Sequence, residues 1–243
     1  MLPILLAIYV FQLTDSGTWR MGISLFQLPP RRVIALFELC EGAPYYRKIG
    51  DLERVHVLYV NNYVGAAPSC LMLRLWLFDP SEELRLIEES PPSARLFYQQ
   101  AVGALDGGQL QAGKRLLQIK GLQSEKTALQ FIAACRQLPG WGVVEFPPSA
   151  TNSAHRPQVS ITINFDQIRL RSSNNEEEEI VIDWAQLTSW RTADDDRTLI
   201  LGWKRDEEDA VEEAIHIHSV FVDFMAECLA RGADERRLAG AMA

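Results

Sequence analysis

The chain has 243 residues, 47% of them hydrophobic and 23% charged, and carries a formal net charge of −8 with a pI near 5.1. This length suits one large domain or two to three small ones, and the hydrophobic content is ordinary for a folded globular protein, so a disordered chain is excluded. The acidic balance argues against a general nucleic-acid binder, because such proteins need a basic surface to displace counterions.

The first 80 residues form a β-rich block. Residues 2–13 are apolar, but the run is shorter than the roughly 20 residues of a membrane-spanning helix and lacks the basic start and cleavage site of a signal peptide. We expect a buried strand or helix there, with a cryptic signal sequence as the alternative. Further apolar runs with strand character follow at residues 33–40, 55–60 and 70–78.

A helical block extends from residue 81 to residue 140. Residues 93–105 place their apolar side chains on one stripe, as an amphipathic helix does. Two further helices are predicted over residues 113–122 and 124–138, and Pro139-Gly140 ends the second of them.

The last third of the chain, residues 158–231, predicts a small β-sandwich. Its apolar runs are short and alternate with polar residues, which indicates strands with one buried and one solvated face. After the last strand the period becomes helical from Phe221 to Cys228, and Ser219 lies at the N-cap position. The expected module is an antiparallel sandwich closed by one C-terminal helix.

Strands followed by a single terminal helix are the layout of a PH/PTB-like domain, a fold used mostly for recognition. An extended peptide would add a strand to the sheet edge beside the closing helix, and residues 187–192 are the candidate edge. Trp190 shares its parity with Thr188 and Thr192, which predicts an indole on the polar face. The alternative is a tryptophan packed under a neighbouring loop. The candidate peptide-binding residues are Ser189, Trp190, Arg191, Val222 and Met225.

The cysteines predict structural thiols. Cys40, Cys70, Cys135 and Cys228 lie far apart, each in or beside an apolar run, and none forms a CxxC pair. We therefore expect reduced, buried side chains in a cytosolic protein.

No motif predicts a nucleotide or metal site. Residues 108–115 match most of a P-loop, but Arg115 stands where a Ser or Thr must hold magnesium, and the loop follows a predicted helix instead of a strand. His216 and His218 share one strand face, where solvated side chains are favoured over a metal pair because no third ligand is near.

Acidic residues gather in three predicted hairpin loops. Solvated turns are the first interpretation and calcium binding is the alternative, although the EF-hand spacing is missing. The runs lie at residues 176–179, 194–196 and 206–209. Because no catalytic constellation is present either, we expect a non-enzymatic protein without a cofactor.

An ordered series of short motifs resembles the FERM-like region of the endosomal sorting nexins, and most closely the member that also carries PDZ and PX domains. The matching positions are residues 35–38, 58–59, 62–63, 70–71, 75–78, 98–102, 145–147, 183–184, 190 and 225–228. This resemblance implies an α+β fold of three lobes followed by a tail. They are a partial ubiquitin-like lobe at residues 1–80, a helical lobe at 81–140, a PH/PTB-like lobe at 141–232 and the tail at 233–243.

The resemblance also implies a function. It predicts a cargo adaptor in endosome-to-plasma-membrane recycling that binds NPxY-type sorting motifs in membrane-protein tails, cytoplasmic and peripheral on early endosomes. Trp190 matches the aromatic residue that borders the peptide in the third lobe. Other sorting-nexin or retromer machinery is implied as a partner. The alternative is a FERM scaffold that binds small GTPases and leaves the sheet edge unused.

Three departures from the family pattern qualify these expectations. The PDZ and PX domains are absent from this chain. Residues 1–32 match the start of the first lobe poorly, which indicates a truncated or mis-spliced gene model, or divergence. Acidic residues 206–214 replace the family's basic loop, and its other basic cluster shrinks to His155-Arg156, which argues against direct phosphoinositide binding there.

Overall fold

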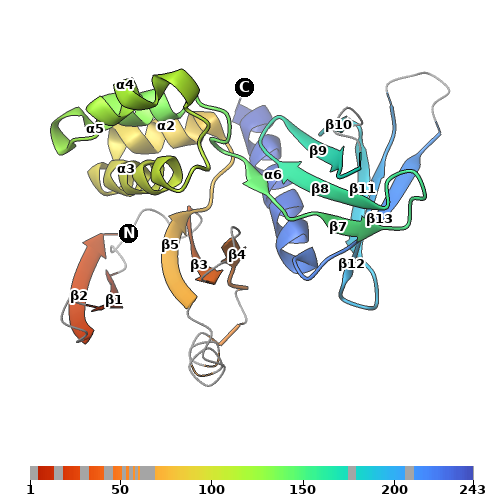
Figure 1. The fold of residues 1–243 in the computed structure, drawn as a ribbon, viewed down its shortest axis with the longest axis horizontal. Helices are drawn as coiled ribbons and strands as arrows, with labels where there is room; N and C mark the ends of the chain where they lie inside the picture. The colour runs from red at the N-terminus through yellow and green to blue at the C-terminus, as the bar shows by residue number, and fades with distance from the viewer. Residues whose placement is uncertain are drawn as a thin grey trace. The chain divides into compact units, whose positions relative to one another are not determined.

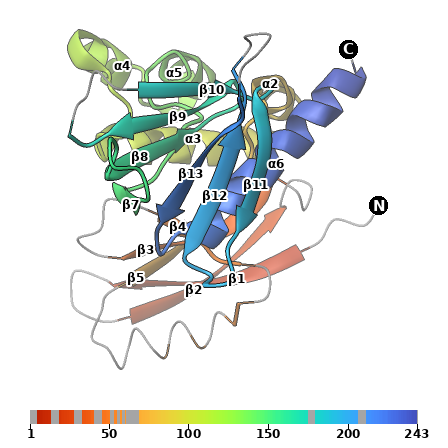
Figure 2. The same cartoon turned by 90° about the vertical axis from the view of Figure 1, so that its right-hand side faces the viewer.

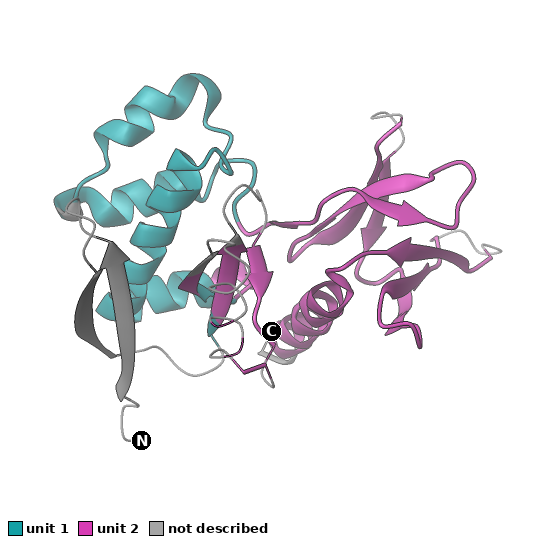
Figure 3. Ribbon diagram, turned by 60° about the horizontal axis from the view of Figure 1, so that its bottom comes forward, with its two compact units in different colours: residues 1–35, 74–76, 82–141 teal, residues 36–73, 77–81, 142–243 magenta. Residues whose placement is uncertain are grey.

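The computed structural model divides the chain into two compact units (Figures 1 and 3). Unit 1 comprises residues 1–35, 74–76 and 82–141, and unit 2 comprises residues 36–73, 77–81 and 142–243. The structure describes residues 5–13, 19–27, 33–40, 46–50, 53–54, 57, 60, 69–174, 179–205 and 211–242. None of the helices found there has the length and apolar character needed to cross a membrane.

The N-terminal apolar run is a strand. β1 (Leu5–Leu13) pairs antiparallel with β2 (Trp19–Gln27), which decides between the two predicted conformations of this segment. β3 (Ile34–Cys40), β4 (Tyr46–Lys48) and β5 (Ser69–Leu75) form a three-stranded sheet in the order β4-β3-β5. These confirm the strands predicted near residues 33–40 and 70–78. The strand predicted at residues 55–60 is wrong where it can be tested, because Val57 and Val60 are helical and the other four residues lie outside the described ones.

The predicted helical block is confirmed. Its elements are α2 (Pro80–Glu89), α3 (Pro91–Asp106), the 3₁₀ turn η1 (Gly113–Arg115), α4 (Leu116–Gly121), the 3₁₀ turn η2 (Glu125–Thr127) and α5 (Ala128–Cys135). Ser90 caps α3 by accepting a bond from the Ser93 backbone N–H, and proline suits the first turn because its missing N–H would have no partner there. Buried Phe131, Ile119 and Leu105 form the apolar core between α3, α4 and α5.

The last third of the chain forms an eight-stranded antiparallel sheet. Its strands are β6 (Val144–Glu145), β7 (Ser149–Thr151), β8 (Gln158–Ile163), β9 (Gln167–Ser172), β10 (Glu179–Asp183), β11 (Leu187–Thr192), β12 (Thr198–Trp203) and β13 (Glu213–His218). The order is β10-β9-β8-β7-β13-β12-β11, and β6 pairs with β8. Alternate residues such as Ile161 and Leu170 are at most 1% exposed, so the predicted division into a buried and a solvated face is confirmed.

The closing helix is longer than predicted. α6 (Val222–Met242) packs against β11 and β12 (Figure 2) and includes most of the segment that was set apart as a tail at residues 233–243. Two contacts of its second half explain the extension. Gly232 lies against the indole of Trp184, and buried Glu235 accepts hydrogen bonds from the backbone N–H groups of Phe78 and Asp79 at 2.8 and 2.7 Å.

Candidate peptide-binding edge

β11 is the outermost strand of the sheet, because the strand order ends with it and no other described strand pairs with its outer edge. The strand lies beside α6 in unit 2 (Figure 2). An unpaired edge presents a row of backbone donors and acceptors that another extended chain can pair with. The arrangement therefore offers the kind of edge that the sequence predicted for residues 187–192.

The register of β11 places Trp190 on the inner face of the sheet. Trp190 lies opposite Leu201, and Leu187 lies opposite Trp203, with an irregularity in the pairing between Leu187 and Ser189. Residues opposite each other share a face, and both partners on β12 are buried. The prediction of an indole on the polar face is therefore wrong. Thr188 is the extra residue of a β-bulge, which brings Leu187 and Trp190 to the same side despite their three-residue spacing.

Ser189 and Arg191 lie on the opposite, outer face of β11, where both are exposed. Arg191 pairs with Ile200 and Ser189 with Gly202. A Cβ atom at Gly202 would approach the Ser189 hydroxyl oxygen to 2.7 Å, so the absence of a side chain there lets Ser189 lie flat on the sheet. Trp190 is half-buried, and the edge thus combines an aromatic residue facing inward with polar residues facing outward.

Val222 and Met225 do not lie on the surface of the proposed groove. They are 1% and 0% exposed and belong to the core between α6 and the sheet. The sequence analysis selected them by helical spacing, which identifies the apolar face of α6 but cannot distinguish its packed centre from an exposed margin. Their side chains are therefore unavailable to a ligand in this structure.

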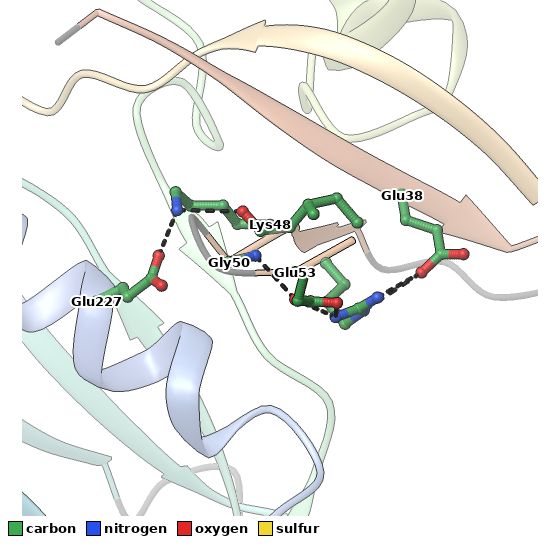
Figure 4. A network of polar contacts seen from close by, with 7 residues as sticks. Glu38, Lys48, Gly50, Glu53 and Glu227 are labelled. Atoms are coloured by element: carbon green, nitrogen blue, oxygen red, sulfur yellow. Dashed lines mark hydrogen bonds and ion pairs between the residues drawn. The ribbon is translucent and has the colours of Figure 1, made fainter. Parts of the chain in front are cut away.

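A network of charged residues fixes α6 from the side of β3 and β4 (Figure 4). Lys48 Nζ lies 2.7 Å from Glu227 Oε2, although the lysine side chain is only 8% exposed. Phe37 and Phe224 pack edge to face with ring centroids 5.9 Å apart. The Glu227 side chain is 39% exposed, so the ion pair is half-buried, and together with the packed rings it ties α6 to β3 and β4.

Arg47 organises the outer part of the same network. Its guanidinium donates to Glu38 and to Glu53 at 2.8 Å each, and Glu53 also accepts the Gly50 backbone N–H (Figure 4). Burial alone would lower the pKa of Arg47, but its bonds with the two carboxylates outweigh burial and raise it. Arg47 therefore stays charged and rigidifies the chain that carries Lys48.

The thiols described by the structure are free and buried. Cys135 and Cys228 are both 0% exposed, as predicted, while the side chains of Cys40 and Cys70 lie outside the described residues. Burial raises the pKa of Cys135 to about 11 and raises that of Cys228 well above its ordinary value. Neither thiol has the low pKa of a reactive cysteine.

The structure also describes the P-loop-like segment, the histidines and part of the acidic runs singled out in the sequence. The P-loop-like residues 108–115 follow α3, so the expected absence of a preceding strand is confirmed. His218 Nδ1 lies 2.8 Å from the Thr198 hydroxyl, which also donates to Asp195 at 2.6 Å. Asp195 closes the β11–β12 turn in this way. The acidic runs at residues 176–179 and 206–209 lie largely outside the described residues.

Comparison with known proteins identifies the fold. No protein-family model matches the chain. The MyTH4-FERM MF2 domain of Dictyostelium discoideum myosin VII is similar with a TM-score of 0.58 at 9% identity, over 95% of this chain and 59% of that one. The MF1 domain of the same myosin gives a TM-score of 0.50 at 10% identity, over 95% of this chain and 60% of that one. The chain therefore spans about three fifths of the length of the structures that it matches.

The chain has an α+β, FERM-like fold. At 9% and 10% identity the likeness shows the fold alone and does not separate one FERM family from another. The resemblance to the sorting nexins remains an inference from sequence motifs.

Two residues important for the candidate site escaped the sequence analysis. Glu227 and Glu235 anchor α6 through partners far away in the chain, Lys48 and the backbone of Phe78 and Asp79. Glu235 lies in a charged run typical of a solvated face, and Glu227 is the one charged residue among the apolar positions 224–229. No local signal marks their role, because it depends on segments that only the fold brings together.

Proposed function

We propose that the chain is a non-enzymatic adaptor whose β11 edge binds NPxY-type sorting motifs of membrane-protein tails, in endosome-to-plasma-membrane recycling. The single observation that supports this most strongly is the unpaired outer edge of β11 beside α6. The half-buried indole of Trp190 at that edge supplies the aromatic contact area that dominates many peptide interfaces. The FERM-like fold supports a role in binding partner proteins.

Peptide binding at this edge would proceed by strand addition. The backbone of the ligand pairs with β11, and its alternate side chains face Trp190 on one side and Arg191 on the other. Main-chain pairing supplies affinity, while these two faces provide selectivity. The fixed position of α6 lowers the ordering cost on binding, because the groove wall is in place before the peptide arrives.

The test is a calorimetric titration of an NPxY peptide against the full chain and against Trp190→Ala. We expect Trp190→Ala to weaken binding about tenfold or more, as truncation of a central aromatic residue does. A peptide with N-methylated backbone amides on alternate residues should bind weakly to the unaltered chain, because it cannot complete the ladder.

Val181→Ala is the matched control, since Val181 is 44% exposed on β10, at the opposite end of the sheet. It should bind the peptide as the unaltered chain does. Equal binding by the Trp190→Ala protein, or no binding by either protein, contradicts the proposal and favours the alternative of a scaffold for small GTPases. The proposed position on early endosomes is tested separately, by imaging the tagged full chain beside an endosomal marker.

A further inference from the structure

A leucine on α4 in unit 1 is almost fully exposed. Leu117 has 85% of its surface accessible, the highest value for a large hydrophobic side chain among the described residues. Residues 113–118 are all exposed, whereas Ile119 is 1% exposed and anchors the segment in the helical core. Neither the peptide edge nor the fold of unit 1 gives Leu117 a role.

Two lysines flank Leu117 on the same face of this segment. Lys114 precedes it by three residues and Lys120 follows it by three, and residues at this spacing are neighbours on a helix surface. Lys114 lies in η1, where a 3₁₀ turn aligns positions three apart even more closely. Ile119 lies two residues from Leu117 and therefore on the opposite face. Lys114, Leu117 and Lys120 define the α4 outer face, and Arg115, which is exposed but also two residues from Leu117, lies off it.

The charge of this face opposes the charge of the whole chain. Residues 107–124 contain three basic side chains and no acidic one, although the chain carries a formal net charge of −8. Lys114 and Arg115 take part in no ion pair within the part of the chain that the structure describes. Lys120 lies 3.0 Å from Asp106, but both side chains are about half exposed, so this pair is weak and easily exchanged.

An exposed leucine between two lysines fits a lipid surface better than a protein surface. Protein interfaces bury roughly 800 Å² on each partner and are depleted in lysine, whereas this face is one short helix with a lysine on each side of a single leucine. At a membrane, the leucine enters the headgroup region while the lysine stems lie along it and their ammonium groups reach the phosphates. Anionic lipid attracts such groups.

We propose that the α4 outer face is a membrane-contact site that inserts Leu117 into anionic lipid, with Lys114 and Lys120 bound to the headgroups. This site differs from the sandwich lobe, where the acidic residues 206–214 argue against lipid binding. It goes beyond the proposed peptide-binding function and does not depend on it. The contact is weak and reversible, because one leucine and two cations supply it.

The experiment is flotation of the full chain with vesicles of phosphatidylcholine, with or without about 30% phosphatidylserine, since anionic lipid attracts basic residues. We expect binding to the anionic vesicles alone. Leu117→Ser should weaken it about tenfold, which corresponds to the loss of a buried leucine side chain. The double variant Lys114→Glu/Lys120→Glu should weaken it at least about 25-fold, from roughly fivefold for each charge.

Matched controls separate local contacts from overall charge and hydrophobicity. Val211→Ser removes a side chain that is 82% exposed in unit 2, and Arg197→Glu/Lys204→Glu changes the net charge as much as the lysine pair does, at exposed positions of unit 2. Both controls should bind as the unaltered chain does. Circular dichroism spectra verify that every variant is folded.

The proposal is overturned by no binding to anionic vesicles, by equal binding to neutral ones, or by equal losses in the controls. Loss on charge reversal with no effect of Leu117→Ser also overturns it, because the face would then attract any acidic surface, including an acidic protein. A loss of vesicle binding in Leu117→Ser that leaves NPxY peptide binding unchanged shows that this site and the peptide edge are independent.

Discussion

The helices α3 and α6 each contain an interior glycine, but the two glycines have opposite surroundings. A Cβ atom at Gly103 of α3 would have no neighbour within 4 Å, whereas one at Gly232 of α6 would lie 2.5 Å from the indole of Trp184. Glycine in α3 therefore only weakens a helix, while glycine in α6 permits a close approach of two elements. The same residue type costs stability in one unit and enables packing in the other.

The hydrogen bonds that anchor the two helices also differ, in how far apart along the chain their partners lie. α3 is capped by Ser90, which accepts a bond from Ser93, three residues away. α6 is held by Glu235, whose backbone partner Phe78 lies 157 positions away in the chain. α3 is therefore specified by its own segment, and α6 by partners that meet it only in the folded unit.

Glu235→Ala tests this difference most severely. The substitution leaves the N–H groups of Phe78 and Asp79 without their acceptor and removes the partner of Arg231. We expect a loss of about 3 kcal/mol in the free energy of unfolding, because buried donors and a partly buried guanidinium lose their compensation. Urea unfolding followed by circular dichroism measures it.

Asp234→Ala is the control for that substitution. Asp234 lies one position before Glu235 in the same helix, and its exposed carboxylate pairs with Arg237. Its removal should change the free energy of unfolding by no more than about 0.5 kcal/mol. If the two variants are equally stable, Glu235 does not anchor α6.

Alanine at the two glycines should give effects of opposite sign. Gly103→Ala is expected to stabilise unit 1 by about 0.5–1 kcal/mol, because alanine is the better helix former and its methyl group meets nothing. Gly232→Ala should destabilise unit 2 by about 1–3 kcal/mol, since the methyl group displaces Trp184. Thermal unfolding of both variants measures the difference, and stabilisation by Gly232→Ala would show that Trp184 is free to move.

Glu83 of α2 is a buried carboxylate in unit 1, and the smallest expected effect on stability concerns its ionisation. It accepts bonds from Trp141 Nε1 at 3.1 Å and pairs with Arg136 at 2.8 Å. Burial raises its pKa above the ordinary value of 4.5, although the bonds from Trp141 and Arg136 oppose this change. The folded state therefore holds this proton more tightly than the unfolded state does.

Stability from Glu83 should consequently be greatest below pH 4.5 and decline as the pH rises through the folded-state pKa. The decline is about 1.4 kcal/mol for each pH unit by which the pKa is raised. Glu83→Gln keeps an acceptor for Trp141 and cannot ionise, so its stability should lack this decline. Urea midpoints from about pH 4 to pH 8 test it, with exposed Glu89→Gln as the charge-matched control. A parallel pH dependence in Glu83→Gln and the unaltered chain would contradict the raised pKa.

Much of the fold could be predicted because its signals are local. The helix predicted at residues 93–105 is α3 (Pro91–Asp106), and the alternation in β8 and β12 identified the buried face of the sheet. The end of α6 was not predicted, because the apolar periodicity stops at residue 231 and the contacts of Gly232 with Trp184 and of Glu235 with the Phe78 backbone join segments far apart in the chain.

The edge strand was predicted in position, but the directions of its side chains were not. Shared parity with Thr188 predicts Trp190 on the polar face, and the β-bulge at Thr188 breaks that parity. Helical spacing selected Val222 and Met225 for the groove, although both are core residues. Each error arises where one position, and not a pattern, decides which way a side chain points.

The bulge in β11 also determines which single-codon deletions the strand can survive. Thr188 is the residue without a counterpart on β12, and its hydroxyl bonds only to Glu212 in the described structure, at 2.5 Å. In-frame loss of Thr188 would leave a regular ladder with every remaining side chain on its present face. Loss of Ser189 would give the same regular ladder with Thr188 opposite Gly202, whereas loss of Arg191 would invert the residues on one side of the gap. Length variation among genes of this fold should therefore be tolerated at either of the two bulge codons and not at the codon of Arg191.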